Sequence, residues 1–184
     1  MGATVSAEVV LVERAERGCR TVLWCGAPEG GRADWLVEKL AELGVERFQP
    51  VECEGARWPA GAGRSERWRR LAIAALRQSR RAFLVEIRAP VRVEQAIETL
   101  EHPAVCVVGD PSGCSPHAAA PSGGGLGIGA IGPSGGFSPR ERALLTAAGF
   151  APIRLADGLL RTETAAISLA AWWAAAAEDE ATGG

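Results

Sequence analysis

The sequence lacks several features that would assign it to common protein classes. It has no stretch of about 18 uncharged apolar residues, so we expect no membrane-spanning helix. Its first residues include early acidic side chains and do not follow the order of a secretory signal, so we expect a cytoplasmic protein. None of the five cysteines forms a Cys-x-x-Cys pair, and the sequence therefore predicts no metal site.

Lysine is also nearly absent, because Lys39 is the only one. The net charge of −2 excludes a polycation that binds nucleic acid through its total charge. Arginines nevertheless gather in one short segment, at Arg64, Arg67, Arg69, Arg70, Arg77, Arg80 and Arg81. Such a cluster favours phosphate binding, and a solvated helix face in an arginine-rich chain is the alternative.

Strand and helix patterns alternate along the chain. Short apolar runs predict strands at residues 21–25, 47–51, 83–87, 104–108, 126–131 and 152–155. Apolar residues at helical spacing predict helices at residues 33–43, 65–79, 93–100, 139–148 and 162–177. This alternation is typical of an α/β fold with a mostly parallel sheet and helices on both faces. Residues 111–125 are rich in proline, serine and glycine and predict a loop.

The length suits one domain, which we place at residues 21–178, between a short segment (1–20) and a disordered tail (179–184). The last helix is apolar almost all round, which indicates that it is buried. A subunit interface would bury it, so we expect a homodimer through this helix.

The segment 131–141 is the strongest candidate for a ligand-binding feature. It joins a predicted strand to a helix start at which Ser138, Pro139 and Glu141 match a capping box. Its glycines would let a ligand lie against the backbone, and a plain connecting turn is the alternative. A Gly-x-Gly-x-x-Gly match at residues 127–132 falls inside the predicted strand, which argues against a dinucleotide site.

Four blocks, residues 32–45, 66–81, 131–141 and 155–165, together resemble the ribosomal RNA small subunit methyltransferase E family of the SPOUT methyltransferases. The resemblance implies a trefoil-knotted C-terminus, a homodimer and S-adenosylmethionine as cofactor. It also implies methylation of N3 of a uridine in the 16S rRNA of the small ribosomal subunit. Residues 1–20 would be a remnant of the family's N-terminal PUA-like RNA-binding barrel.

The resemblance also implies site residues. The cofactor would be held by three loops through Val108, Gly109, Ile131, Gly132, Pro133, Gly135, Gly136, Leu155, Leu159 and Leu160. Backbone groups in such loops can bind a flat, neutral adenine without charge. Arg161 and Arg81 would stabilise the negative charge of the acceptor uridine, with Glu163 as orienter or base. Helix capping is the alternative role for Arg161 and Glu163.

The expected RNA contacts are Arg32, Arg67, Arg70, Arg77 and Arg81, and Trp58 could stack on a base. The sequence departs from the family pattern at four positions. Ser134 replaces a glutamate of the turn, and Glu29 replaces a basic residue before the first helix. Ala156 and Gly158 replace a glycine and an arginine in the third loop. These departures leave a second hypothesis open, a non-catalytic SPOUT-fold dimer that binds RNA or cofactor.

Overall fold

The computed structural model describes residues 20–59, 61, 63–101, 104–116 and 125–182, with the backbone alone for 177–182. Its seven strands form one sheet in the order β3-β2-β1-β6-β5-β7, and β4 pairs with β2. The strands are β1 (Arg20–Cys25), β2 (Arg47–Glu52), β3 (Glu86–Ile87), β4 (Val91–Arg92), β5 (Ala104–Cys114), β6 (Leu126–Ile131) and β7 (Ala151–Ile153). All pairings between these strands are parallel, which confirms the predicted sheet.

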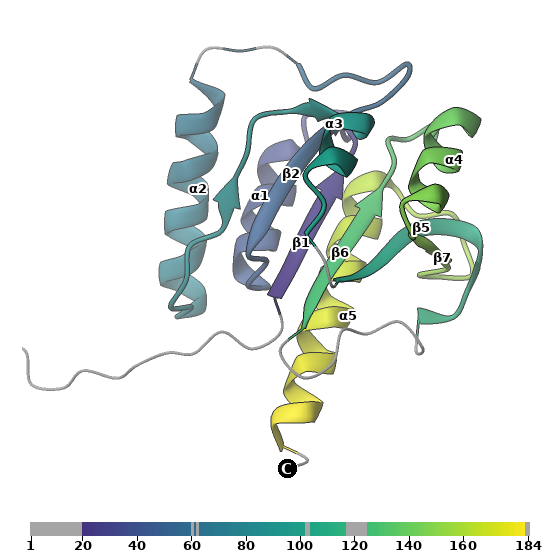
Figure 1. Ribbon diagram of the computed structural model, residues 1–184. Helices are drawn as coiled ribbons and strands as arrows, with labels where there is room; N and C mark the ends of the chain where they lie inside the picture. Colours follow the sequence, from purple (N-terminus) through teal and green to yellow (C-terminus); the bar gives the residue numbers. More distant parts are fainter. Residues whose placement is uncertain (1–19, 60, 62, 102–103, 117–124, 183–184) are drawn as a thin grey trace, which may run out of the picture.

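Helices cover both faces of this sheet, as predicted (Figure 1). One face carries α1 (Ala33–Glu42), α2 (Arg64–Ser79) and α5 (Thr162–Thr182), and the other carries α3 (Val93–Glu98) and α4 (Pro139–Ala147). Along β1, Leu23 and Cys25 pack into the core beneath α1, α2 and α5, whereas Val22 and Trp24 pack into the core beneath α3 and α4. The strand is therefore continuously apolar, because a covered parallel sheet buries both of its faces.

The prediction of a loop at residues 111–125 is wrong for residues 111–114. They belong to β5, which continues to Cys114 and pairs there with Ile153 of β7. The two strands approach so closely that a Cβ on Gly113 would lie 2.5 Å from the Ile153 amide nitrogen. Proline, serine and glycine indicate a loop by local preference, and pairing with β7 overrides that preference. The expected strand at 83–87 is also shorter, since only Glu86 and Ile87 pair with β2. Residues 117–124 lie outside the described residues.

The last helix packs on the sheet at a point where β6 has no side chain. Leu169 and Trp173 of α5 are fully buried, and a Cβ on Gly129 would lie 2.3 Å from Leu169 Cδ2. Gly127 and Gly129 thus lie within β6 and open no helix, as the sequence indicated. Because α5 packs against α1, β1 and β6, much of its apolar surface is buried in its own chain. Burial of this helix therefore does not by itself require a partner, and the homodimer stays a prediction.

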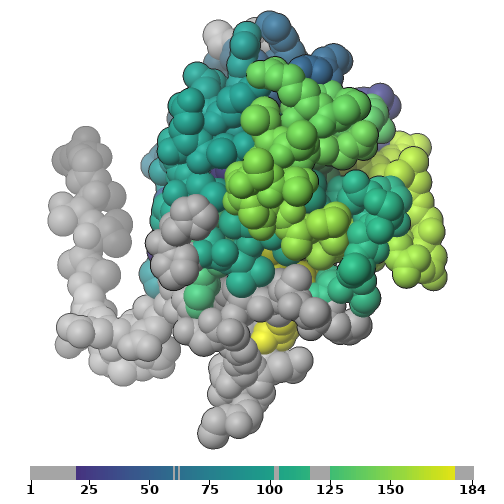
Figure 2. Space-filling view, turned by 45° about the vertical axis from the view of Figure 1, so that its right-hand side comes forward, coloured from purple at the N-terminus to yellow at the C-terminus, as the bar shows by residue number. Residues whose placement is uncertain are grey.

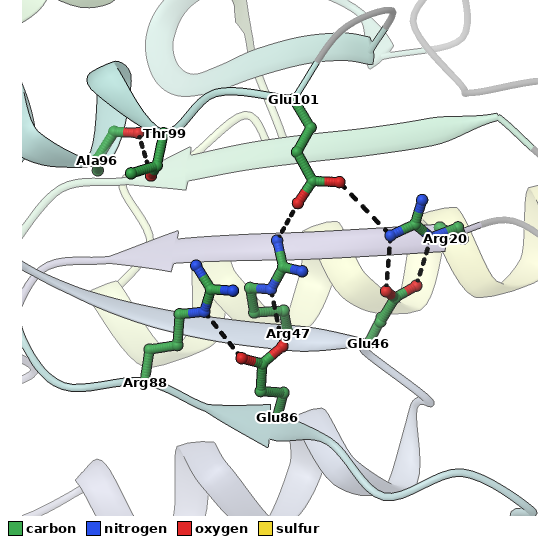
Figure 3. Close-up of polar contacts among 8 residues, drawn as sticks. All are labelled: Arg20, Glu46, Arg47, Glu86, Arg88, Ala96, Thr99 and Glu101. Atoms are coloured by element: carbon green, nitrogen blue, oxygen red, sulfur yellow. Dashed lines mark hydrogen bonds and ion pairs between the residues drawn. The ribbon is translucent and has the colours of Figure 1, made fainter.

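Ion pairs join the strands at the amino end of the sheet (Figure 3). Arg47 of β2 donates to Glu86 at 3.0 Å and also pairs with Glu101, which precedes β5. Arg20 of β1 lies 2.9 Å from Glu46 and 3.6 Å from Glu101. Hydrogen bonds from Arg47 are the main cause that lowers the pKa of both Glu86 and Glu101, with Arg88 contributing at Glu86 and Arg20 at Glu101. The network ties the starts of four neighbouring chain segments together.

Candidate ligand-binding site

A pocket lies where three adjacent strands end. Because β6, β5 and β7 are parallel neighbours, the segments that follow them meet at one edge of the sheet. In Figure 2 the end of β5 (teal), α4 (green) and the segment after β7 (yellow-green) lie side by side. The pocket is lined by Gly109, Asp110, Pro111, Ile131, Gly132, Pro133, Ser134, Gly136, Phe137, Ile153, Arg154, Leu155, Ala156, Gly158, Leu159, Leu160, Thr162 and Ala165.

The turn after β6 forms one wall and is held in a tight conformation. The Gly136 amide donates to the Pro133 carbonyl at 2.7 Å, and Gly136 has a φ of +73°, which favours glycine. A Cβ on Gly132 would lie 2.8 Å from the Phe137 amide nitrogen, so a larger residue would not fit this bend. The turn therefore depends on its glycines for its shape.

Beyond this turn, α4 begins with the predicted capping box. The Ser138 hydroxyl accepts from the Glu141 amide at 3.2 Å, and the Glu141 carboxylate accepts from the Ser138 amide at 2.8 Å. Glu141 is buried and also accepts from the Glu54 amide at 2.8 Å, so one carboxylate joins the start of α4 to the segment after β2. The turn is thus anchored at its far end.

The structure brings the predicted cofactor residues together, with two exceptions. Gly109, Ile131, Gly132, Pro133, Gly136, Leu155, Leu159 and Leu160 all line the pocket. Val108 instead points into the core between the sheet, α3 and α4. Gly135 is exposed, and a Cβ added to it would meet no atom within 4 Å. The three predicted loops therefore form one site in this fold.

Four polar residues of the pocket lining were missing from the predicted cofactor set: Asp110, Ser134, Arg154 and Thr162. The Asp110 carboxylate accepts from the Ser112 hydroxyl at 2.6 Å and from its amide at 2.8 Å, and these bonds lower the pKa of Asp110. Thr162 is 5% exposed, and its buried Oγ1 has no hydrogen-bond partner among the described residues. Asp110 follows a predicted loop residue directly, but nothing in the sequence marks the Thr162 hydroxyl as unpaired.

Of the predicted catalytic residues, Arg161 and Glu163 lie beside the pocket and Arg81 does not. Arg161 is exposed, and its carbonyl accepts from the Ala165 amide at 2.8 Å, so it also starts α5. Glu163 is 4% exposed and accepts from Arg32 Nη1 at 2.8 Å. Arg81 donates from Nε to the Glu42 carbonyl at 3.0 Å, at the end of α1. Within one chain Arg81 thus lies apart from Arg161, because α1 ends at the amino edge of the sheet, and its catalytic role stays a prediction.

Of the predicted RNA-binding arginines, some lie on α2, away from the pocket, and one lies near the pocket. Arg70 and Arg77 are exposed on α2, and Arg67 pairs there with Asp34 of α1. Figure 1 shows α2 at one side of the molecule and α4 and β7, next to the pocket, at the other. Arg32 is near the site, but its partner is the buried Glu163.

The expectation that Trp58 stacks on a base is wrong. Trp58 is 4% exposed, and its Nε1 donates to the carbonyls of Cys25 and Val51, both at 3.2 Å. Its ring lies 5.4 Å from that of Trp68 and 5.9 Å from that of Phe48. Its position in a loop suggested exposure, whereas the indole fills the core beneath that loop.

No helix among the described residues is long and apolar enough to cross a membrane. The described residues also contain no group of three or more His, Cys, Asp or Glu side chains that could hold a metal ion.

Comparison with known proteins agrees with this architecture. Residues 15–174 match the family described as RNA methyltransferase domain. The chain is 34% identical over 138 residues to ribosomal RNA small subunit methyltransferase E of Aquifex aeolicus, covering 74% of this chain and 59% of the relative. The protein of the same name from Mycobacterium bovis is 33% identical over 152 residues, covering 76% of this chain and 56% of the relative. The chain thus spans little more than half the length of these relatives.

Solved structures show the same fold. Ribosomal RNA small subunit methyltransferase E of Neisseria gonorrhoeae, bound to S-adenosyl methionine, is 27% identical with a TM-score of 0.76, covering 84% of this chain and 65% of that one. A Legionella pneumophila protein in complex with the cofactor SAM is 29% identical with a TM-score of 0.79, covering 86% and 67%. The predicted resemblance is confirmed, and the chain belongs to the RNA methyltransferase domain family, among relatives named ribosomal RNA small subunit methyltransferase E.

Proposed function

We propose that this chain binds S-adenosylmethionine in the pocket and methylates N3 of a uridine in the 16S rRNA of the small ribosomal subunit. The observation that carries the proposal is the convergence of residues 109–111, 131–137 and 153–165 on one pocket. Membership of the RNA methyltransferase domain family and the cofactor-bound relatives support it. An rRNA substrate implies a cytoplasmic location.

The pocket suits an adenosyl group. Ile131, Phe137, Leu155 and Leu160 provide apolar surface for a flat ring. Gly109, Gly132 and Gly136 leave backbone N–H and C=O groups open to a ligand, because they carry no Cβ. The Thr162 hydroxyl is buried and has no partner in the part of the chain that the structure describes, and a buried hydroxyl is stabilised by a ligand that supplies one. The residues present therefore fit this cofactor.

When bound, S-adenosylmethionine supplies an electrophilic methyl group. The chain must then stabilise an acceptor uridine that has lost its N3 proton and carries negative charge on its carbonyl oxygens. Arg161 is exposed and lies in the chain between Leu160 and Thr162 of the pocket, so its guanidinium is a donor available to such oxygens. Glu163 is buried and paired with Arg32, which suits an orienting role.

The exposed arginines of α2 support a separate contact with RNA. Arg70 and Arg77 lie on a solvent-facing side of the helix, where they can pair with phosphates. In one chain this side is remote from the pocket. We therefore assign it to holding the RNA and not to the reacting nucleotide, and we assign Arg81 to the same surface.

Substitution of Arg161 tests the reaction. We expect Arg161→Ala to lower kcat by about a hundredfold, because it removes a donor to charge that develops in the transition state. Binding of the cofactor, measured by calorimetry, should be unchanged. The assay is methylation of small subunits from cells that lack the modification, with the nucleotide identified by mass spectrometry.

Arg57→Ala is the matched control, since Arg57 is exposed in the loop after β2, does not line the pocket and lies outside the arginine cluster of α2. Cofactor binding without methylation of these subunits would favour the non-catalytic alternative, in which the departures at Ser134 and Gly158 have cost the activity. No cofactor binding by the unaltered chain would contradict the proposal as a whole.

A further inference from the structure

The loop between β1 and α1, residues 26–32, contributes no residue to the pocket lining but contacts two of its walls. It contains the sequence Pro28-Glu29-Gly30-Gly31, which resembles the Pro133-Ser134-Gly135-Gly136 turn of the pocket. The two stretches follow adjacent parallel strands, with Cys25 of β1 in register with Ile131 of β6. They therefore emerge side by side at the carboxyl edge of the sheet.

The first contact fixes the turn after β6. A Cβ on Gly26 would lie 2.5 Å from the Pro133 nitrogen, so the loop backbone lies directly against the turn. The Gly26 amide also donates to the Ile131 carbonyl at 2.8 Å. Further along the loop, the Ser134 hydroxyl donates to Glu29 Oε1 at 2.6 Å. The turn is thus held at its start and at its exposed tip.

The second contact fixes the start of α5. Arg32, the last residue before α1, donates from Nη1 to Glu163 at 2.8 Å. Glu163 follows Thr162 of the pocket, and its side chain is only 5% exposed. A carboxylate with so little access to water needs a charged partner, so Arg32 strongly restricts where the first turn of α5 can lie.

We infer that Glu29 and Arg32 are positioning residues that set the spacing between the Ser134 turn and the start of α5, and thereby the affinity for the cofactor. The inference rests on the proposed function of the pocket. Both walls are fastened to one seven-residue loop, so a change in that loop moves one wall relative to the other. This role of Glu29 also accounts for two departures from the family pattern together, because Glu29 and Ser134 are hydrogen-bonded to each other.

Calorimetric titration of the full chain with S-adenosylmethionine tests this inference. We expect Glu29→Ala and Ser134→Ala each to weaken binding by about fivefold, the usual effect of one hydrogen bond. The double variant should be no weaker than either single variant, because both remove the same interaction. Glu29→Gln should bind as the unaltered chain does, since its amide oxygen can still accept from Ser134.

Kinetics separate positioning from damage to the fold. Glu29→Ala should raise the KM for the cofactor with kcat nearly unchanged, and its melting temperature should match that of the unaltered chain. Arg32→Lys keeps the charge and should bind more tightly than Arg32→Gln. Glu66→Ala is the control, because Glu66 is an exposed glutamate of α2 remote from the pocket.

Additive losses from Glu29→Ala and Ser134→Ala, or unchanged affinity in both, would overturn the inference while leaving the proposed function intact. Absence of binding by the unaltered chain would overturn both. The two failures are thus distinguished by the titration of the unaltered chain alone.

Discussion

Thr162 shows how a single residue can be unfavourable to the fold and favourable to function. This residue lies in the pocket wall and is 5% exposed, and its buried hydroxyl has no partner among the described residues. A buried polar group in that state costs about 1–3 kcal/mol of folding free energy. Such costs are commonly retained where a ligand supplies the missing hydrogen bond.

We therefore expect opposite effects of Thr162→Val on the free and the liganded protein. Valine keeps the shape and removes the hydroxyl, so the melting temperature without cofactor should not fall. The affinity for S-adenosylmethionine should fall by about tenfold, because one hydrogen bond to the ligand is lost. Differential scanning calorimetry and titration measure the two quantities. Thr146→Val, at an exposed position of α4, should change neither of them, and equal cofactor affinity in both variants would contradict the prediction.

At the scale of elements, the network at the amino end of the sheet links stability to pH. The folded-state pKa values of Glu86 and Glu101 lie below their usual range, mainly because Arg47 donates hydrogen bonds to both carboxylates. A lowered folded pKa stabilises the fold above the unfolded value of about 4.3. That contribution is lost as the pH falls through the lowered folded values.

The double variant Glu86→Gln/Glu101→Gln should accordingly lose less stability than the unaltered chain between pH 7 and pH 3.5. Urea midpoints at a series of pH values provide the measurement. Both side chains are well exposed, so the difference should shrink in 1 M NaCl. Parallel pH profiles for the two proteins would show that the network has no such role.

The sequence predicted these elements well where local pattern and tertiary environment agree. The order of strands and helices and the Ser138 capping box follow from apolar periodicity and turn chemistry. The path of residues 111–114 and the packing of Gly129 do not, because they depend on contacts between segments far apart in the chain. The position of Arg81 relative to Arg161 within one chain does not follow either, since it depends on the fold. The trefoil knot and the domain limits stay predictions.

At the scale of the whole molecule, the exposed side of α5 bears on assembly. Within the described side chains of this helix, Thr164, Ala171 and Ala175 are the exposed ones, and all are small. Small residues allow two helices to approach closely. We propose that the homodimer forms through this side, which leaves Leu169 and Trp173 in the core of each chain.

Ala171→Arg should then convert a dimer to a monomer, because a charged side chain would be forced into the helix contact. Light scattering after size-exclusion chromatography measures the mass. Ala147→Arg on α4 is the matched control and should stay dimeric. A monomeric unaltered chain at micromolar concentration would remove the basis for this assembly.

The packing of α5 against β1 has a consequence for biosynthesis. The earliest described strand and the last helix are neighbours in the fold although nearly the whole described sequence separates them. During translation, the surface of the sheet that receives Leu169 and Trp173 stays uncovered until those residues leave the ribosome. A nascent chain arrested before residue 162 would present that uncovered surface to chaperones, and final closure of the core would occur only after release.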